Sequence, residues 1–230
     1  MELRATGLVV GLIVPTVPQG VRVPGVPEIT FDRLSRIFGE LAPSYGYRDF
    51  QSSPAGDSAK IGGGDSQGAL LIQPGLVQFI DAVPMAPEVS QENAIGVLRT
   101  VAKHLQMEVV VQLGVKWVFN APTPEGEGKS LVLEQLLKMA DADIEELSLG
   151  RSIWAGARFQ TQGADDQAIS TRIEPLEADP TKLYIECDAT FPERAPRLLS
   201  GGAAGVLQAI IDVLAYARGP VQGYLEKRVG

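Results

Sequence analysis

The chain has 230 residues, 45% of them hydrophobic, which is enough to bury a core in one large domain or two small ones. Its formal net charge of -8 argues against general binding to nucleic-acid backbones, which would repel it. Its single cysteine, Cys187, excludes an internal disulfide and a cysteine-based zinc site.

Membrane and export signals are weak in this sequence. Residues 1–14 resemble the start of a short signal peptide, but the flank before the apolar run carries Glu2 as well as Arg4, and no small-x-small cleavage site follows. No apolar run approaches the roughly 18 residues that a membrane helix needs. We therefore expect a cytoplasmic protein that does not contact a membrane.

The first part of the chain, residues 1–107, alternates between strand-like and helix-like patterns. Strands are expected at 6–14, 47–52, 67–73 and 76–82. Helical periodicity follows Thr30 and Ser90, and both are residue types that cap helices. Pro74 and Gly75 suit a tight turn, so 67–82 is expected to form a hairpin. The stretches "VPQGVRVPGVPE" and "SPAGDSAKIGGGDSQ" have the composition of mobile connections.

The second part, residues 108–230, carries the same kinds of segment. Strands are expected at 108–120, 151–162, 167–176 and 182–190. One helix is expected to be capped by Ser130 and to run at least to Ala140. A final helix is expected to begin near Ser200 and to end at "RGP", residues 218–220.

The order of elements predicts an internal duplication. Strand, helix, strand, hairpin and helix occur twice, with an offset of about 105 residues. We therefore predict an α+β protein made of two β-α-β-β-β-α repeats, residues 1–107 and 108–230, packed into one compact body. Most sheet pairing is expected to be antiparallel, with helices on one face of the sheet.

Two expected strands differ in how apolar and polar residues are distributed over their two faces. In 182–190 the apolar residues occupy one face and polar residues the other, which predicts one wet face. In 6–14 both faces are apolar, because Val9 and Ile13 lie opposite the main apolar row. The second face of this strand is therefore expected to meet either the other repeat or another subunit.

The stretch "TPEGEGKS", residues 123–130, ends like a phosphate-binding loop. Its beginning departs from that motif, because Pro124 has no N–H to donate and Glu125 and Glu127 repel phosphate. We interpret it as a structural loop before a helix. "IGGGDSQG", residues 61–68, precedes a strand and is interpreted as part of a hairpin.

The other candidate reactive groups have structural interpretations. His104 is the only histidine, which excludes a multi-histidine metal site, and it lies on the flank of its helix. Cys187 lies on the apolar face of its strand and is interpreted as an inert core residue. "DADIEE", residues 141–146, is interpreted as a solvated helical face.

The strongest candidate for a binding surface is the polar sheet face of the second repeat. Aromatic, guanidinium and carboxylate groups alternate outward on its three strands and could hold a ligand or a partner protein. Cross-strand ion pairs on an ordinary solvated face explain the same pattern. The candidate residues are Trp154, Arg158, Arg172, Tyr184, Glu186 and Asp188.

The run Gly114, Val115, Lys116, Trp117, Val118, Phe119 and Asn120, followed by a proline-containing loop, carries a family resemblance. It resembles a mid-chain strand in a sporadically distributed family of bacterial proteins of about 250 residues with no assigned function. Lysine stands where that family has arginine, and one extra residue precedes the asparagine. Residues 174–189 are similar to the late strand pair of the family. The resemblance implies duplicated α+β halves and no catalytic residues.

These observations predict a non-enzymatic binding or assembly protein, a scaffold or subunit of a homo- or hetero-oligomeric complex, with no cofactor. Self-association or a protein partner is expected, and nucleic acid is not. One alternative is a sensor that binds a small molecule in a pocket between the two repeats. Another is a hydrolase that uses Glu186 and Asp188, two apart on a strand, as an acid/base pair.

Overall fold

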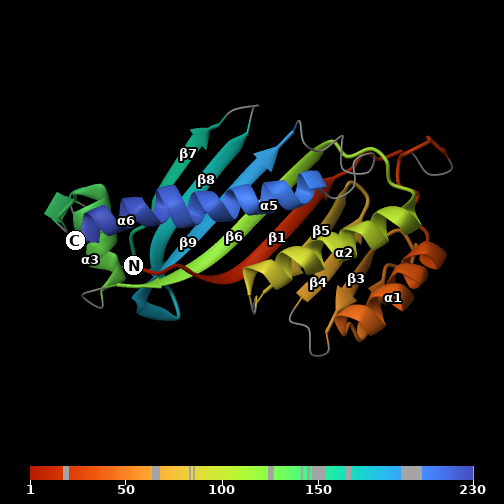
Figure 1. Cartoon of the computed structure of the whole chain (residues 1–230), viewed down its shortest axis with the longest axis horizontal. Helices are drawn as coiled ribbons and strands as arrows, with labels where there is room; N and C mark the ends of the chain where they lie inside the picture. The colour runs from red at the N-terminus through yellow and green to blue at the C-terminus, as the bar shows by residue number, and fades with distance from the viewer. Residues whose placement is uncertain are drawn as a thin grey trace.

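The computed structural model describes residues 1–17, 21–63, 68–82, 84, 86–123, 127–140, 142–143, 146, 154–163, 167–192 and 204–229. It is an α+β protein in which a single nine-stranded sheet has the order β2-β3-β4-β5-β1-β6-β9-β8-β7 (Figure 1). Every neighbouring pair of strands is antiparallel. The predicted α+β class and the antiparallel pairing are confirmed, and the internal duplication stays a prediction.

The elements have the following bounds. The strands are β1 Arg4–Ile13, β2 Asp49–Ser52, β3 Ala59–Gly62, β4 Gly68–Gln73, β5 Leu76–Asp81, β6 Gln112–Pro122, β7 Ala157–Gln162, β8 Ala168–Leu176 and β9 Asp179–Phe191. The α-helices are α1 Phe31–Tyr45, α2 Pro87–Leu105, α3 Gly128–Ser130, α5 Ala204–Tyr216 and α6 Gln222–Val229. Two π-helical segments, η1 Leu131–Leu137 and η3 Ala217–Val221, follow α3 and α5.

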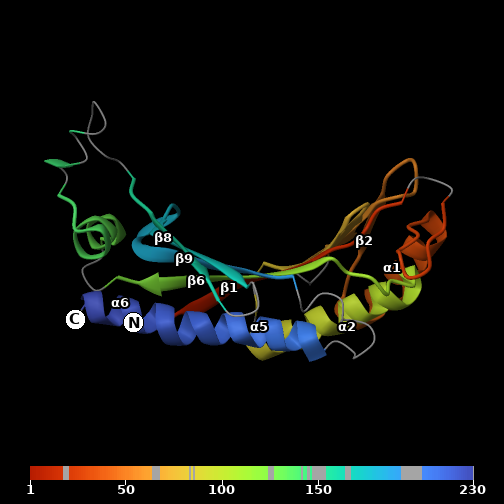
Figure 2. The same ribbon diagram turned by 90° about the horizontal axis from the view of Figure 1, so that it is seen from above.

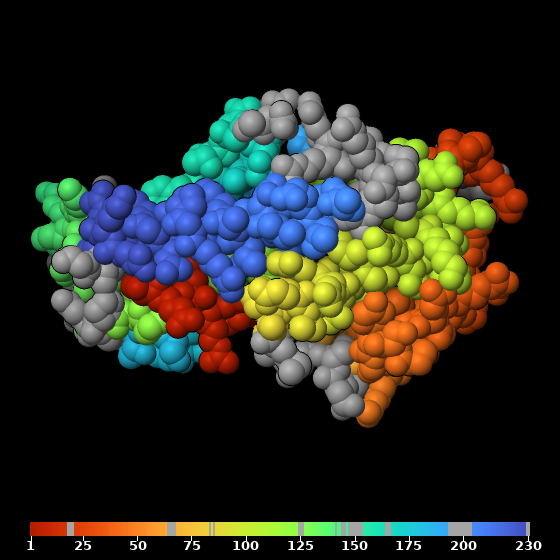
Figure 3. Space-filling model, in the orientation of Figure 1, coloured from red at the N-terminus to blue at the C-terminus, as the bar shows by residue number. Residues whose placement is uncertain are grey.

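The core lies between one face of the sheet and the helices. Figure 2 shows α2, α5 and α6 along one side of a bowed sheet whose other side is concave. In the space-filling view α5 adjoins α2 over the covered side (Figure 3). Strand residues alternate between the two faces. Those on the covered face of β6, including Trp117 and Phe119, are fully buried.

Several local predictions are confirmed. Thr30 caps α1, with its side chain accepting a hydrogen bond from the backbone N–H of Arg33. The hairpin around Pro74 and Gly75 joins β4 to β5, and Gly75 has a φ of 84°, which glycine adopts without strain. Strand β9 buries Leu183, Ile185, Cys187 and Ala189 and leaves its alternate residues half-exposed.

Strand β3 was not predicted. Its four residues lie in a stretch expected to be a mobile connection, yet Ala59 and Ile61 are buried and the strand pairs with both β2 and β4. The first part of the chain therefore has the order β-α-β-β-β-β-α, one strand more than the predicted unit. A four-residue strand flanked by Gly and Ser shows too little alternation to be recognised.

Two predicted helix caps are wrong. Helix α2 begins at Pro87, because proline suits the first turn, where its missing N–H costs no hydrogen bond. Ser90 lies inside that turn, and its hydroxyl donates to Asp81 at 2.6 Å, which ties α2 to the end of β5. Ser130 lies at the end of α3 and donates to Glu127 at 2.6 Å.

The two later helices also end differently from the prediction. The segment after Ser130 is π-helical and ends at Leu137, because Lys138 takes a left-handed conformation with a φ of 54°. The final helix continues through Arg218 to Pro220 as the π-helical η3. A π-helical turn leaves room for Pro220, which has no N–H to donate. The predicted start near Ser200 lies outside the described residues. Of the 141–146 face, residues 142, 143 and 146 are described, and all three are exposed.

The second face of β1 is not covered by the other half of the chain. Strands β1 and β6 are neighbours in one continuous sheet, so the two halves lie side by side. On the concave side Val9 is half-buried and Ile13 is 39% exposed. Of the two covers that we expected, packing of the other repeat against this face is wrong for the described residues, and cover by another subunit stays a prediction.

An ion-pair cluster joins α1 to α2. Glu40 accepts from Lys103 Nζ at 2.9 Å and contacts His104 Nε2 at 2.8 Å. The bond from Lys103, followed by that from His104, lowers the pKa of Glu40 to about 2. His104 is half-buried on the flank of its helix, as predicted.

This cluster predicts a pH dependence. Because the folded pKa of Glu40 lies below its ordinary value of 4.5, its stabilising effect is complete above pH 4.5 and is lost as the pH falls through about 2. We expect Glu40→Gln to flatten the curve of unfolding free energy against pH in this window, as measured by urea denaturation. Parallel curves for both proteins would contradict the prediction.

Candidate functional site

The concave side of the sheet, called the open face below, has a charged half and an apolar half. The charged half spans β6, β9, β8 and β7, and the apolar half spans β4, β5 and β1. Residues on this face come from alternate positions of each strand. They include Val9, Gly11, Ile13, Leu71, Leu76, Gln78, Ile80, Gly114, Lys116, Val118, Arg158, Ser170, Arg172, Glu174, Tyr184, Glu186 and Asp188.

The centre of the charged half is a lysine held by two carboxylates. Lys116 Nζ lies 3.3 Å from Glu186 Oε2 and 3.4 Å from Asp188 Oδ2, across the β6–β9 pairing. Tyr184 also donates its hydroxyl to Glu186 Oε2, at 2.8 Å. Burial, and then this bond, raises the pKa of Tyr184, so the phenol stays a hydrogen-bond donor at neutral pH.

The outer part of the charged half is built around arginine. Arg172 forms a two-pronged ion pair with Glu174, with both N···O distances at 2.8 Å, and its guanidinium lies 5.8 Å from the centre of the Tyr184 ring. Arg158 Nε donates to Ser170 Oγ at 3.0 Å. The ion pair of Arg172 therefore runs along β8, and the bond from Arg158 joins β7 to β8.

Five of the six residues named from the sequence lie on the open face, namely Arg158, Arg172, Tyr184, Glu186 and Asp188. Trp154 does not alternate with Arg158 on one strand as expected, because β7 begins only at Ala157; it is 42% exposed. Sequence reasoning missed Lys116 as a site residue. Its signal was available, since it is a charged residue between the alternating apolar positions Val115 and Trp117.

A second missed feature is a pair of glycines at the centre of the open face. Gly11 and Gly114 lie opposite each other in the β1–β6 pairing. A Cβ added at Gly11 would meet Leu76 Cδ1 at 4.0 Å, and one at Gly114 would meet only the carbonyl oxygen of Gly11 at 3.9 Å. Both distances are ordinary van der Waals contacts, and neither glycine has a positive φ. The folded chain itself therefore does not require glycine at these positions.

The reactive groups named from the sequence are either buried or held in ion pairs. Cys187 is fully buried, and burial raises the pKa of its thiol to about 12, so it is protonated at neutral pH. Glu186 and Asp188 share the ammonium group of Lys116, which holds both carboxylates in ion pairs. Among the described residues, no three His, Cys, Asp or Glu side chains gather as a metal site.

The described part of the phosphate-loop-like stretch packs against the β8–β9 hairpin. Thr123 donates its hydroxyl to the carbonyl oxygen of Thr181 at 2.9 Å. A Cβ at Gly128 would lie 3.0 Å from the carbonyl oxygen of Pro180 and 3.1 Å from that of Lys182. Close packing against backbone explains Gly128, which supports the structural interpretation of this stretch. Residues 124–126 lie outside the described part.

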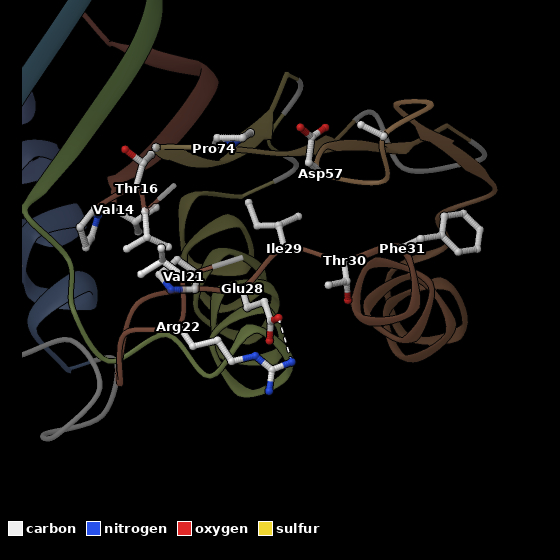
Figure 4. A pocket seen from close by; sticks show the side chains of 15 residues that line it. Val14, Thr16, Val21, Arg22, Glu28, Ile29, Thr30, Phe31, Asp57 and Pro74 are labelled. Atoms are coloured by element: carbon white, nitrogen blue, oxygen red, sulfur yellow. Dashed lines mark ion pairs between the residues drawn. The ribbon is translucent and has the colours of Figure 1, made fainter. Parts of the chain in front are cut away.

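A cavity of about 730 Å³ lies where the loop after β1 meets the start of α1 and the turns near Asp57 and Pro74 (Figure 4). Several of its polar groups already have partners within the chain. Arg22 pairs with Glu28 at 3.2 Å, Thr30 caps α1, and Asp57 accepts from Ser53 at 2.7 Å. These contacts give Arg22, Glu28, Thr30 and Asp57 a structural explanation without a ligand.

A second cavity, of about 250 Å³, lies between β7, β8 and the C-terminal helices. Its lining is mainly apolar and includes Phe159, Ile173, Val221 and Tyr224. Each of the two cavities is lined by residues from one half of the chain only. Neither therefore supports a small-molecule pocket between the halves.

Comparison with known proteins gives no family assignment: no protein-family model matches the sequence, and no curated protein matches it significantly. Within the described residues, the helices are all too short or too polar to span a bilayer. The candidate site therefore has to be interpreted from its own geometry.

Proposed function

We propose that this chain is a non-enzymatic binding or assembly protein, a subunit of a homo- or hetero-oligomeric complex that holds a protein partner on its open face. The observation that carries the proposal is the second face of β1, where Val9 and Ile13 lie on the side of the sheet opposite α2, α5 and α6. Apolar side chains on both faces of a strand favour cover on both sides. The helices cover one face of β1, and we assign the cover of its other face to a partner.

The glycine pair supports the same surface. A glycine inside a strand weakens the strand and often marks a place where another backbone approaches closely. Because Gly11 and Gly114 have no steric role inside the chain, an approaching partner accounts for them. The concave shape of the face favours a convex partner, since two such faces turned toward each other would touch only at their rims.

The charged half suits an interface that is specific in its orientation. Lys116, Arg172 and their carboxylate partners are held by bonds across or along the strands, so they are already ordered before a partner arrives. Ordered charges at the rim of an apolar surface select partners and fix their orientation more than they add affinity.

We also propose that the chain arose by internal duplication and that it belongs to the bacterial family named above. The strand order supports the duplication: outward from the centre, β1-β5-β4-β3 and β6-β9-β8-β7 follow the same succession in their own halves. The boundary proposed at residue 107 falls between α2 and β6. The family membership depends on the motif around Lys116 and Trp117.

A photo-crosslinking residue placed at Ile13 tests the open face. We expect it to form a discrete crosslinked product with a protein in the cells that make this chain, identified by mass spectrometry. The matched control is Ile211, which has nearly the same exposure, 38% against 39%, but lies on helix α5 over the other side of the sheet. The control position is expected to form no such product.

The double substitution Gly11→Ala and Gly114→Ala then tests contact with the glycine pair. The new methyl groups fit the folded chain, so thermal stability should be unchanged or higher. The crosslink from Ile13 should become weaker, because the methyl groups occupy the approach of the partner. Equal products from Ile13 and Ile211, or no product from Ile13, would overturn the proposal.

A further inference from the structure

Strand β7 forms one outer edge of the sheet, with β8 as its only strand neighbour among the described residues. Gly163 N donates to Gln167 O at the end of the β7–β8 pairing. This bond determines which residues of β7 direct their backbone N–H and C=O groups toward β8. Antiparallel pairs alternate between hydrogen-bonded and non-hydrogen-bonded residues. Thr161, Phe159 and Ala157 therefore bond to β8, and the backbone groups of Arg158 and Gln160 point outward.

Within the described residues, the sequence and pairing of β7 show none of the usual protections against strand addition. Edges are commonly blocked by shortness, proline, bulges or charge. The opposite edge strand, β2, has four residues, begins with Asp49 and is followed closely by Pro54. Strand β7 has six residues, no proline and no register shift, and the guanidinium of its one charged residue, Arg158, donates inward to Ser170.

Phe159 adds an apolar contact to this edge. Its side chain is 39% exposed, lies edge-on to Tyr224 at 6.1 Å between ring centres, and lines the 250 Å³ cavity beneath β7. This volume is below the range of about 300–1,000 Å³ that small-molecule pockets occupy. The cavity therefore suits one large side chain better than a separate ligand.

We propose that β7 pairs antiparallel with β7 of a second copy of this chain, around a twofold axis that passes at Phe159. The outward backbone groups of Arg158 and Gln160 lie symmetrically on either side of Phe159. Arg158 of each copy therefore forms backbone hydrogen bonds with Gln160 of the partner subunit. The strand is thus self-complementary, as a twofold interface requires. This edge contact is separate from the open face, which stays available to another partner.

A disulfide tests the register. In the proposed pairing Phe159 faces Phe159 of the partner subunit as a non-hydrogen-bonded pair, with Cα atoms about 4.5 Å apart, inside the range of roughly 4.4–6.8 Å that disulfides span. Phe159→Cys is expected to form a disulfide-linked dimer under mild oxidation. The native Cys187 is buried and does not interfere.

Arg158→Cys is the matched control. Position 158 lies opposite position 160 of the partner subunit, so two cysteines at 158 are displaced by about 7 Å along the strands and cannot bridge. Little disulfide dimer is expected. Equal yields from the two variants would overturn the proposal, because they would indicate random collision.

Sedimentation equilibrium of the native chain gives a second measurement. We expect twice the single-chain mass of 24.5 kDa at micromolar concentration. Gln160→Pro removes an outward N–H without breaking the β7–β8 pairing, so the mass should fall to that of one chain. Gln160→Ala keeps the N–H and should leave the dimer intact.

The edge proposal is overturned if the native chain sediments at 24.5 kDa and the Phe159→Cys variant forms no disulfide-linked dimer. The open-face proposal does not fail with it, since the Ile13 crosslink is measured independently. A dimer that persists in a folded Gln160→Pro variant also overturns the edge proposal and assigns the contact to another surface. If that variant fails to fold, the comparison of the two cysteine variants decides.

Discussion

Replacing Trp117 with alanine is expected to lower the free energy of unfolding by about 3–5 kcal/mol. Trp117 is fully buried in β6, near the middle of the sheet, and its ring stacks on Phe119 at 6.1 Å between ring centres. Its indole Nε1 donates to the carbonyl oxygen of Ile210 in α5 at 3.1 Å. The substitution therefore removes both core volume and a bond between the sheet and α5, and urea denaturation measures the loss.

Two further variants separate these contributions. Trp117→Phe keeps an aromatic ring but removes the indole N–H that donates to the Ile210 carbonyl, and is expected to cost about 0.5–1.5 kcal/mol from the lost bond. Trp154→Ala changes the other tryptophan, which is 42% exposed, and is expected to cost about 1 kcal/mol or less. Equal losses at Trp117 and Trp154 would contradict the position of Trp117 in the core.

Replacing Gly128 with alanine is expected to lower the free energy of unfolding by about 1–3 kcal/mol. The new Cβ would lie 3.0–3.3 Å from backbone atoms of Pro180, Lys182 and Pro175, which cannot move aside as a flexible side chain could. The result, measured by urea denaturation, distinguishes a glycine required by packing from one that opens a phosphate-binding loop.

Gly39 provides the matched control. It lies within helix α1, and a Cβ there would meet nothing within 4 Å. Gly39→Ala is therefore expected to stabilise the chain by about 0.4–1 kcal/mol through the unfolded state. If Gly128→Ala were also stabilising, or if ATP with magnesium raised the unfolding midpoint of the native chain, the packing role of Gly128 would be wrong.

The candidate site could be predicted in part because alternation along a strand is local. The outward positions of Tyr184, Glu186 and Asp188 follow from the period of two in β9, and the structure places them on the open face. Their ion-pair partner Lys116 comes from a strand about 70 residues earlier in the chain. Nothing local in either stretch indicates that β6 and β9 are neighbours.

The glycine pair and the free edge were missed for the same reason. Gly11 and Gly114 each look like an isolated strand glycine until the β1–β6 register sets them opposite each other. Phe159 becomes an edge residue only because β7 lies outermost in the strand order. Both features are properties of strand pairing, which a one-dimensional pattern does not contain.

By itself, the sequence determined the features that depend on a few consecutive residues: the Thr30 cap, the Pro74–Gly75 turn, the polarity of the two faces of β9 and the α+β composition. These depend on backbone preference and short-range periodicity. The tertiary structure alone decided that the halves share one sheet, that Ser90 bonds to Asp81, that α5 continues through Pro220, and that the second face of β1 stays open. Each of these depends on which distant segments pack together to bury the most apolar surface, and that choice is made by the whole chain.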